Sequence, residues 1–317
     1  MNTTKIKGIV ISALSLGTVQ LGVNYGINND AGKPDRTVAF QILDTAMEKG
    51  ITALDTAAGY GESEEVIGAW LKTVDPAKRP YIMTKLGHDA VGSKNLDQLR
   101  KDVRAGVEQA KAKLGLEQIP LLMLHNMDDY NGNEDNITKV FEELKASGDI
   151  LHSGISAYSH HDYGKIAESG FDATQIPLNI FDWVQIENGG IEKLEKSGMM
   201  VFVRSVYLQG LVFRNADNPG PGMEFAIPTL QKFRNLCQKY ELEPATLAMS
   251  FVLSLPGVHS LVLGSEKVSQ VEQNAALLEK VVKLSDEQMA EIRANFVDTP
   301  EQVLFPRLWP NAMAGSR

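Results

Sequence analysis

The sequence of 317 residues is poor in the side chains that cross-link a fold or hold a metal ion. Its single cysteine, Cys237, excludes an internal disulfide framework and a cysteine-based zinc site. The spacings His-x-His and His-x-x-x-His do not occur, which makes a metal-dependent hydrolase a poor interpretation. The adjacent residues His160 and His161 are expected to begin a helix, where neighbouring side chains point apart. We therefore expect no metal site.

Long apolar runs and an excess of positive charge are also missing. No apolar run approaches the roughly 20 residues of a membrane-spanning helix. A net charge of −9, from 31 basic and 40 acidic residues, argues against nucleic acid or an anionic membrane as a partner. Two lysines precede an apolar run at 8–17, but no clean small-x-small cleavage site follows. We interpret this segment as two short strands and expect a cytoplasmic protein whose partner is a small molecule.

Strands and helices alternate along the rest of the chain. Strands are predicted at 14–17, 52–55, 81–86, 121–125, 152–156, 173–176, 200–204 and 260–263. Helices are predicted at 37–49, 63–73, 96–114, 137–147, 161–168, 191–196, 229–240, 244–254, 268–282 and 286–294. The strands are short and apolar without alternation, as expected when both faces are buried.

Eight such units fit one closed (β/α)8 barrel better than an open sheet. No Gly-x-Gly-x-x-Gly follows the first strand, which counts against a doubly wound dinucleotide fold. We expect a single domain over 1–317, with a β-hairpin at 5–13 before the barrel. Long connections at 19–36, 126–136 and 208–227, with the tail 296–317, mark the C-terminal face as the functional face.

Four polar residues stand at or just past the ends of three successive strands: Asp55, Tyr60, Lys85 and His125. A phenol is a weak acid, and a nearby ammonium stabilises the phenolate, so Lys85 could activate Tyr60. Asp55 could keep Lys85 charged, and His125 could orient a substrate oxygen by hydrogen bonding. Such a group suits protonation of a carbonyl oxygen while hydride arrives at the carbon.

Each of the four residues also has a purely structural interpretation. Asp55 could cap a turn, Tyr60 could pack as an aromatic ring, Lys85 could be an exposed charge, and His125 could be a satisfied buried histidine. The functional interpretation is favoured because all four converge on one face of the predicted barrel.

The order Asp, Tyr, Lys, His on these strand ends resembles the aldo-keto reductase family, and bacterial members most of all. Further matches over nearly the whole chain are Leu16-Gly17-Thr18, Leu54-Asp55-Thr56-Ala57, Gly59-Tyr60-Gly61, Gly154-Ile155-Ser156 and Gly264-Ser265. The resemblance implies reversible carbonyl reduction with NADP or NAD, without metal. It implies that Tyr60 is the general acid and base, that Lys85 and Asp55 tune it, and that His125 orients the carbonyl.

The resemblance also implies an extended nicotinamide cofactor at the C-terminal face. The residues that would bind it are Gly17, Thr18, Gln20, Asp55, Ser156, Gln175, Arg204, Ser205, Leu208, Gly210, Gly264, Ser265, Lys267, Gln270, Gln273 and Asn274. The last of these begin a predicted helix, whose N-terminus favours phosphate.

Three positions depart from the family pattern. Ala157 replaces an asparagine that commonly contacts the carboxamide, and Arg204 replaces an aromatic ring that commonly stacks on the nicotinamide. A planar guanidinium can also stack, and it brings positive charge that favours polar or anionic substrates. Glu266, followed by Lys267, stands where a cation often meets the 2′-phosphate, so the choice between NADP and NAD stays open.

Two other functions compete with the oxidoreductase. The chain could be a cofactor-binding regulatory protein with little turnover, or a lyase that uses Lys85 as a Schiff-base nucleophile. An intact set of four residues favours the oxidoreductase over the regulator. Asp55 beside Lys85 would keep the lysine protonated and so opposes the lyase.

Overall fold

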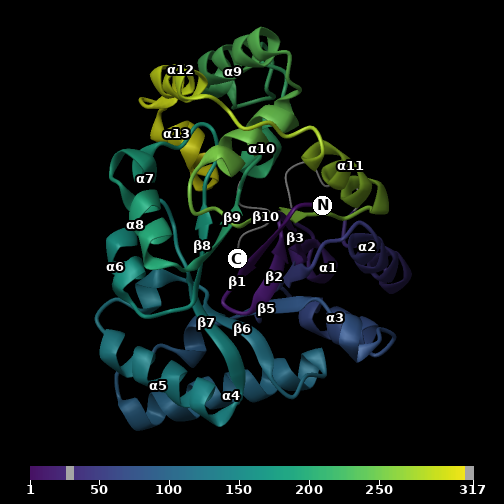
Figure 1. Cartoon of the computed structure of the whole chain (residues 1–317), viewed down its shortest axis with the longest axis vertical. Helices are drawn as coiled ribbons and strands as arrows, with labels where there is room; N and C mark the ends of the chain where they lie inside the picture. Colours follow the sequence, from purple (N-terminus) through teal and green to yellow (C-terminus); the bar gives the residue numbers. More distant parts are fainter. Residues whose placement is uncertain (26–31, 311–317) are drawn as a thin grey trace.

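The computed structural model describes residues 1–25 and 32–310. A closed barrel of eight parallel strands has the order β10-β3-β4-β5-β6-β7-β8-β9 (Figure 1). The strands are β3 (Leu14–Gly17), β4 (Ala53–Asp55), β5 (Tyr81–Leu86), β6 (Ile119–Leu124), β7 (Ile150–Ser156), β8 (Ala173–Pro177), β9 (Met200–Arg204) and β10 (Ser260–Gly264). The predicted (β/α)8 barrel is therefore confirmed.

Helices surround the barrel on its outside (Figure 1). The longer ones are α2 (Arg36–Glu48), α3 (Ser63–Leu71), α4 (Leu96–Leu114), α5 (Glu134–Ser147), α8 (Gly190–Ser197), α9 (Ile227–Tyr240), α10 (Pro244–Ser254), α11 (Val268–Leu278) and α12 (Asp286–Phe296). Short helices are α1 (Val19–Gly22), α6 (Tyr163–Glu168), α7 (Val184–Glu187) and α13 (Glu301–Leu304). None of the helices in the described segments is long and apolar enough to cross a membrane.

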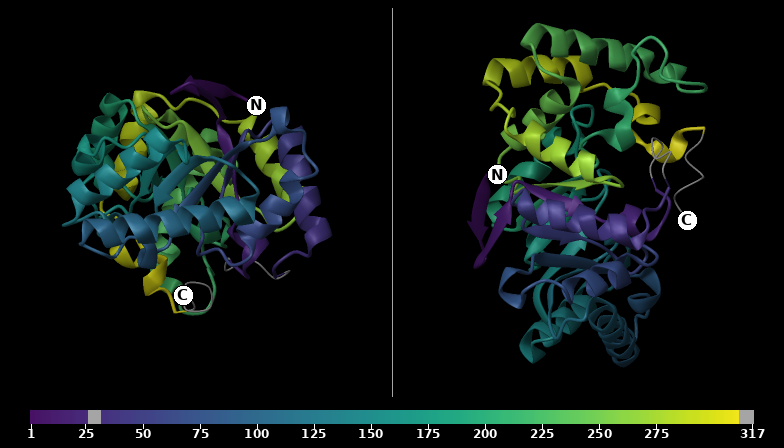
Figure 2. Two further views of the ribbon diagram at one scale, coloured as in Figure 1. Left: turned by 90° about the horizontal axis from the view of Figure 1, so that it is seen from below. Right: turned by 90° about the vertical axis from the view of Figure 1, so that its right-hand side faces the viewer.

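The predicted N-terminal hairpin is confirmed as β1 (Thr3–Ile6) paired antiparallel with β2 (Ile9–Ser12). It lies across one end of the barrel (Figure 2). From β2, the fully buried Ile11 joins an apolar cluster with residues that point into the barrel, among them Met83, Leu121 and Phe202. The hairpin therefore seals the end opposite the C-terminal ends of the strands.

Several helices begin or end two to four residues from their predicted bounds, among them α5, which begins at Glu134 rather than at 137. The helix expected at 161–168 begins at Tyr163, because the Asp162 side chain caps the backbone N–H groups of Gly164 and Lys165. The helix expected at 268–282 ends at Leu278. The chain then turns back onto α10, where the backbone N–H of Val282 donates to the Ser250 hydroxyl at 3.1 Å. Apolar residues beyond 278 keep the spacing of a helix in the sequence, although the helix itself has ended.

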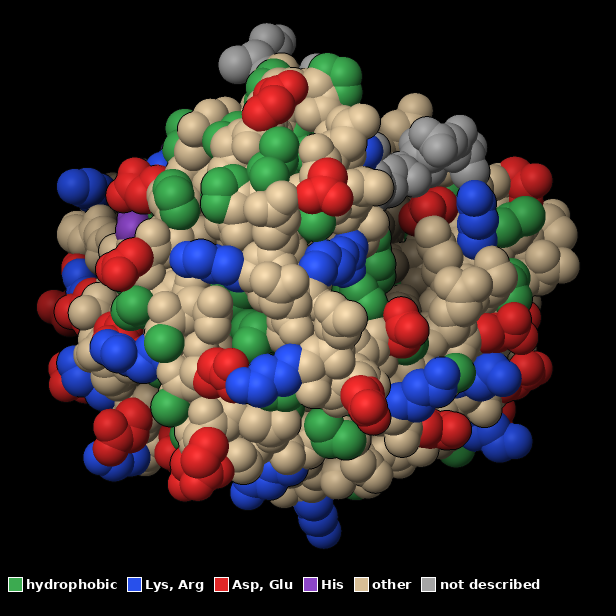
Figure 3. Space-filling model, turned by 90° about the horizontal axis from the view of Figure 1, so that it is seen from above, with side chains coloured by type: hydrophobic (Ala, Val, Ile, Leu, Met, Phe, Trp, Pro, Cys, Tyr) green, Lys and Arg blue, Asp and Glu red, His purple; other side chains and the backbone are tan. Residues whose placement is uncertain are grey.

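Helices α9 and α12 lie together at one edge of the molecule (Figure 1). The Lys239 ammonium and the Tyr240 hydroxyl on α9 both bind the Glu291 carboxylate of α12, at 2.6 and 2.8 Å. The face of the molecule at this edge mixes basic and acidic side chains, without a large patch of either sign (Figure 3).

Candidate active site

The three strand ends that carry the predicted catalytic residues are neighbours in the barrel. Asp55 ends β4, Lys85 lies near the end of β5, and His125 directly follows β6. Tyr60 lies in the loop between β4 and α3. Because parallel strands present their C-terminal ends on one face, the four side chains meet at the mouth of the barrel.

Lys85 and Asp55 form a buried ion pair. The Lys85 Nζ atom lies 2.6 Å from Asp55 Oδ1, and the exposed fractions of the two side chains are 0% and 5%. Lys85 also donates to the Thr56 carbonyl oxygen at 2.9 Å, and the Gln175 amide donates to Asp55 Oδ1 at 2.8 Å. Burial alone would lower the pKa of the Lys85 ammonium, but Asp55 and Tyr60 outweigh it and raise that pKa. Lys85 therefore remains charged.

The Tyr60 ring lies between this ammonium and His125. Its centroid is 5.0 Å from Lys85 Nζ, and the His125 ring meets it edge-on with centroids 5.7 Å apart. Burial lowers the pKa of His125 to about 4, and the charges of Lys85 and Arg204 add to this effect. His125 is therefore neutral at pH 7 and can donate one N–H hydrogen bond.

Close backbone packing positions the Tyr60 loop. The first turn after β3, helix α1, brings Gly22 so near that a Cβ atom there would lie 1.7 Å from the Tyr60 carbonyl oxygen. Gly61 has φ of 56°, and a Cβ there would lie 2.6 Å from the Gly22 carbonyl oxygen. Only glycine at both positions permits this approach, so the two glycines fix where the phenol stands.

Thr18 stabilises the start of the Tyr60 loop through buried hydrogen bonds. Its hydroxyl lies 2.8 Å from the Asp55 carbonyl oxygen and 2.8 Å from the Ser63 hydroxyl, and it is fully buried. Thr56 also donates to Ser63, at 2.9 Å. The Thr18 hydroxyl is thus engaged inside the protein and is not presented to a ligand.

Apart from Asp55 on β4, the residues predicted to bind the cofactor lie on or after the other strands of the mouth. They follow the continuous order β7, β8, β9, β10 and β3 around the barrel. Ser156 and Gln175 are register partners at the ends of β7 and β8, and Gly264 and Gly17 are partners at the ends of β10 and β3. The four predicted catalytic residues, which lie on or after β4, β5 and β6, form the first arc of the rim. The cofactor-binding set on β7, β8, β9, β10 and β3 forms the second arc.

The loop after β9 has an unusual backbone. Ser205, Leu208 and Gln209 have φ of 63°, 45° and 51°, and Gly210 follows with 90°. Non-glycine residues rarely adopt positive φ, and such strain is retained mainly where the surrounding structure requires a particular shape. Leu208 is nevertheless buried. The loop therefore has a defined shape directly after β9, and its approach to a ligand stays a prediction.

Gln20 and Gly264 lie in unusually close contact at the mouth. A Cβ atom on Gly264 would lie 2.5 Å from both polar atoms of the Gln20 amide, so only glycine lets this side chain lie against β10. The Gln20 Oε1 atom is buried without a hydrogen-bond partner among the described residues. A buried unpaired acceptor beside a glycine at the mouth fits a site that a polar ligand completes.

The start of α11 presents a mixed group of side chains. Ser265 is buried, Gly264, Lys267 and Gln273 are exposed, and Asn274 is half-buried. The Gln270 side chain accepts from the backbone N–H groups of Glu266 and Lys267 at 2.9 and 3.2 Å and donates to the Glu266 carboxylate at 2.6 Å. Gln270 is therefore occupied in shaping the turn, and it anchors Glu266 there.

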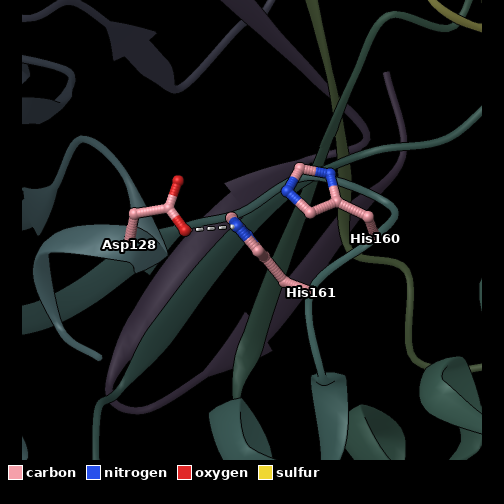
Figure 4. A group of neighbouring side chains, drawn as sticks. All are labelled: Asp128, His160 and His161. Carbon is pink, nitrogen blue, oxygen red and sulfur yellow. Dashed lines mark hydrogen bonds and ion pairs between the residues drawn. The ribbon is translucent and has the colours of Figure 1, made fainter. Parts of the chain in front are cut away.

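The pair His160 and His161 is not the start of a helix, which corrects the sequence-based prediction. Their rings lie 4.2 Å apart between centroids and, with Asp128, bring three possible metal ligands together (Figure 4). However, His161 Nδ1 accepts the backbone N–H of Tyr158 at 3.0 Å, so its proton is on Nε2 and is donated to Asp128 at 3.2 Å. A metal ion on Nε2 would need a fully deprotonated ring, so the geometry favours a brace between loops.

Two tyrosines at the mouth were missed by the sequence analysis. Tyr158 follows the end of β7 by two residues, and the Arg204 guanidinium lies 4.8 Å from its ring centroid. Tyr25, in the long loop after α1, has its pKa raised by burial and by the nearby Tyr60. Both come from loops rather than strand ends. For Tyr25 the available signal was an aromatic residue in the long connection 19–36; for Tyr158 it was an aromatic residue two positions after a strand end.

The comparisons with known proteins agree with this geometry. The sequence model of the aldo/keto reductase family matches residues 13–295. An NADH-specific methylglyoxal reductase of Escherichia coli K12 is 27% identical, over 88% of this chain and 92% of its own length. An L-glyceraldehyde 3-phosphate reductase of Escherichia coli O157:H7 is also 27% identical, over 92% and 90%.

Solved structures show the same fold. An aldo-keto reductase from Bacillus halodurans, in its holo form, superposes with a TM-score of 0.76 at 22% identity, over 96% of this chain and 99% of that one. The family match covers nearly the whole chain, and the mouth has a buried Asp-Lys pair beside a tyrosine. The chain belongs to the aldo/keto reductase family and is an oxidoreductase that reduces carbonyl groups with NADH or NADPH.

Proposed function

We propose that the protein reduces a small polar aldehyde or ketone to an alcohol, with Tyr60 as the general acid. One observation carries this assignment: the Lys85 ammonium, paired with Asp55 in a dry environment, lies 5.0 Å from the Tyr60 ring centroid. Tyr60 lies at the C-terminal end of the barrel, and the hairpin closes the opposite end. The relatives named for methylglyoxal and L-glyceraldehyde 3-phosphate support a small, oxygen-rich substrate.

A nicotinamide bound at the second arc would supply the hydride that the carbonyl carbon accepts. Tyr60 gives its phenolic proton to the carbonyl oxygen, so that the product is a neutral alcohol. Lys85 stabilises the phenolate that remains, and Asp55 holds Lys85 charged and in place. His125, which is neutral because of its lowered pKa, donates an N–H hydrogen bond to the same oxygen and orients it. The oxidation of an alcohol uses the same residues in reverse.

Cofactor binding is assigned to the second arc of the rim. Ser156 and Gln175 would face the nicotinamide, and the Ser205 to Gly210 loop would follow the pyrophosphate. Gln20 and the start of α11 would hold the adenosine end, where helix N–H groups favour phosphate. Gln270 would act indirectly, since its amide already shapes the turn.

The lyase interpretation is weaker. A Schiff-base lysine must lose its proton to become a nucleophile. The pKa of Lys85 is raised on balance, which opposes that step. The regulatory interpretation differs from ours only in turnover, so it is tested by the same kinetics as the role of Tyr60.

The test compares Tyr60→Phe, Lys85→Met and the double variant. Tyr60→Phe keeps the ring and removes the proton, so NAD(P)H binding measured by fluorescence titration should survive. Single-turnover carbonyl reduction should fall by roughly 10²–10⁴-fold. Lys85→Met should fall similarly, and the two losses should not add, because both residues serve one proton transfer.

Two results would contradict the proposal. If Tyr60→Phe retains more than about a tenth of the wild-type rate when chemistry is rate-limiting, Tyr60 is not the acid. If the wild type binds NAD(P)H but reduces no member of a broad panel of aldehydes, ketones and sugars, the regulatory function replaces the reductase.

A further inference from the structure

The mouth contains a guanidinium, that of Arg204, with no carboxylate partner in the part of the chain that the structure describes. Arg204 is the last residue of β9, and its Nη2 donates to the Ala157 carbonyl oxygen at 3.0 Å. Within residues 1–25 and 32–310, no carboxylate oxygen lies within ion-pair distance of it. A guanidinium has five N–H donors, so most of its hydrogen-bonding capacity is available to a ligand. Lys85, the other cation of the site, is neutralised by Asp55.

The charge of Arg204 reaches the residues that would hold the substrate. Together with burial and Lys85, it lowers the pKa of His125. It also lowers the pKa of Tyr25, against burial, Tyr60 and Tyr158, which all raise that pKa. Arg204 therefore lies within electrostatic reach of His125 and Tyr25, and its guanidinium packs on the ring of Tyr158.

The guanidinium is held in place before any ligand arrives. The guanidinium carbon lies 4.8 Å from the Tyr158 ring centroid, and the His160 ring stacks on Tyr158 with centroids 5.9 Å apart and an interplanar angle of 13°. The backbone of Tyr158 is fixed by His161, which in turn donates to Asp128 (Figure 4). A group that is already positioned loses less entropy on binding.

We propose that Arg204 forms an anion subsite, so that the preferred carbonyl substrate carries a carboxylate or phosphate group that this guanidinium binds. The inference rests on the proposed carbonyl reduction and adds the class of substrate to it. A planar guanidinium matches carboxylate and phosphate oxygens through two parallel hydrogen bonds. The anionic group of the substrate thus supplies the partner that Arg204 lacks among the described residues.

The kinetic test uses carbonyl pairs that differ in one anionic group. Succinic semialdehyde is compared with butanal, and glyceraldehyde 3-phosphate with glyceraldehyde. The readout is the ratio of kcat/KM for the charged and uncharged members, so any common effect on the cofactor cancels. Wild type should prefer at least one charged member, and Arg204→Gln should lower that ratio by roughly tenfold to hundredfold. The pair that responds identifies carboxylate or phosphate.

Two further variants separate the local contact from bulk charge. Lys101→Gln on α4 removes one exposed positive charge at a distance from the mouth and should leave the ratio unchanged. Arg204→Lys keeps the charge but not the planar fork, so it should give an intermediate ratio. Equal ratios in wild type and Arg204→Gln would overturn the subsite.

A binding measurement makes the subsite testable without turnover. Succinate and inorganic phosphate are titrated calorimetrically into wild type and Arg204→Gln, both saturated with NADH. Binding that is present in wild type and lost in the variant supports the subsite, even if every carbonyl in the kinetic test is left unreduced. Arg204-dependent binding without any reduction would refute the proposed carbonyl reduction but not the subsite. Equal binding, or none, in the two proteins would refute the subsite.

Discussion

His125 shows how the surroundings of one residue set its chemistry. Its folded-state pKa of about 4 lies below the ordinary value of 6.5, so the neutral ring persists as pH falls through 6.5. Between pH 6.5 and 4, His125 takes up a proton in the unfolded chain but not in the folded protein. The free energy of unfolding should therefore decrease between pH 6.5 and 4.

This prediction is checked by NMR titration of the histidine Cε1–H signals, with His125→Gln identifying the signal that disappears. The His125 signal should stay constant from pH 8 to about pH 5. The variant should also lose less of its unfolding free energy over the acidic interval. A His125 midpoint near 6.5 would show that the ring is not shielded as described.

Glu266 bears on the choice between the two cofactors. Its carboxylate is anchored by the Gln270 amide at the start of α11, where it would repel a 2′-phosphate. Glu266→Arg should tighten NADPH relative to NADH by about 1–2 kcal/mol, as expected for one gained charge-assisted contact. Parallel fluorescence titrations measure the ratio, and Glu272→Arg, exposed on the same helix, controls for charge. A wild type that already binds NADPH a hundredfold tighter would contradict this role.

At the scale of elements, helix α1 controls the Tyr60 loop through Gly22. Gly22→Ala would place a methyl group 1.7 Å from the Tyr60 carbonyl oxygen, so one of the two backbones must move. Because a shift of about 1 Å in a catalytic group can reduce the rate roughly 10²-fold, kcat should fall by about that factor. Gly87→Ala is the matched control, since its Cβ would meet nothing within 4 Å and its φ is −71°. Equal kcat values for both variants would exclude this role of α1.

Much of the element pattern was predictable because polar residues interrupt apolar runs where strands leave the barrel. Asp55, Lys85 and His125 each mark a strand end, and their convergence follows from parallel strands alone. The approach of Gly22 to Tyr60 was not predictable, since it joins two loops through tertiary packing. Tyr158 and the His160–His161 pair were misjudged or missed because loop conformation, rather than periodicity, decides where their side chains point.

At the scale of the whole molecule, the hairpin contributes a plug to the barrel core. Ile11 is fully buried against the barrel interior, whereas its neighbour Val10 is 51% exposed. Ile11→Ala should lower the free energy of unfolding by about 2–5 kcal/mol, through lost burial and the cavity left behind. Val10→Ala should change it by less than about 0.5 kcal/mol. Denaturant unfolding measures both, and similar losses would mean that the hairpin does not plug the barrel.

The division of the rim into two arcs has a consequence for how such an enzyme can diversify. Proton transfer is assigned to β4, β5 and β6, and cofactor binding to β7 through β10 with β3. Side chains on one arc can change without replacing those on the other. The choice of nicotinamide cofactor and the proton-transfer residues can therefore change in separate evolutionary steps. Asp55 joins the two arcs: the Gln175 amide donates to its carboxylate at 2.8 Å, and the Thr18 hydroxyl donates to its carbonyl oxygen at 2.8 Å. A chimera that exchanges only the loop between β10 and α11 for that of a relative should therefore inherit that relative's nicotinamide preference, while Arg204 on β9 keeps the class of carbonyl compound unchanged.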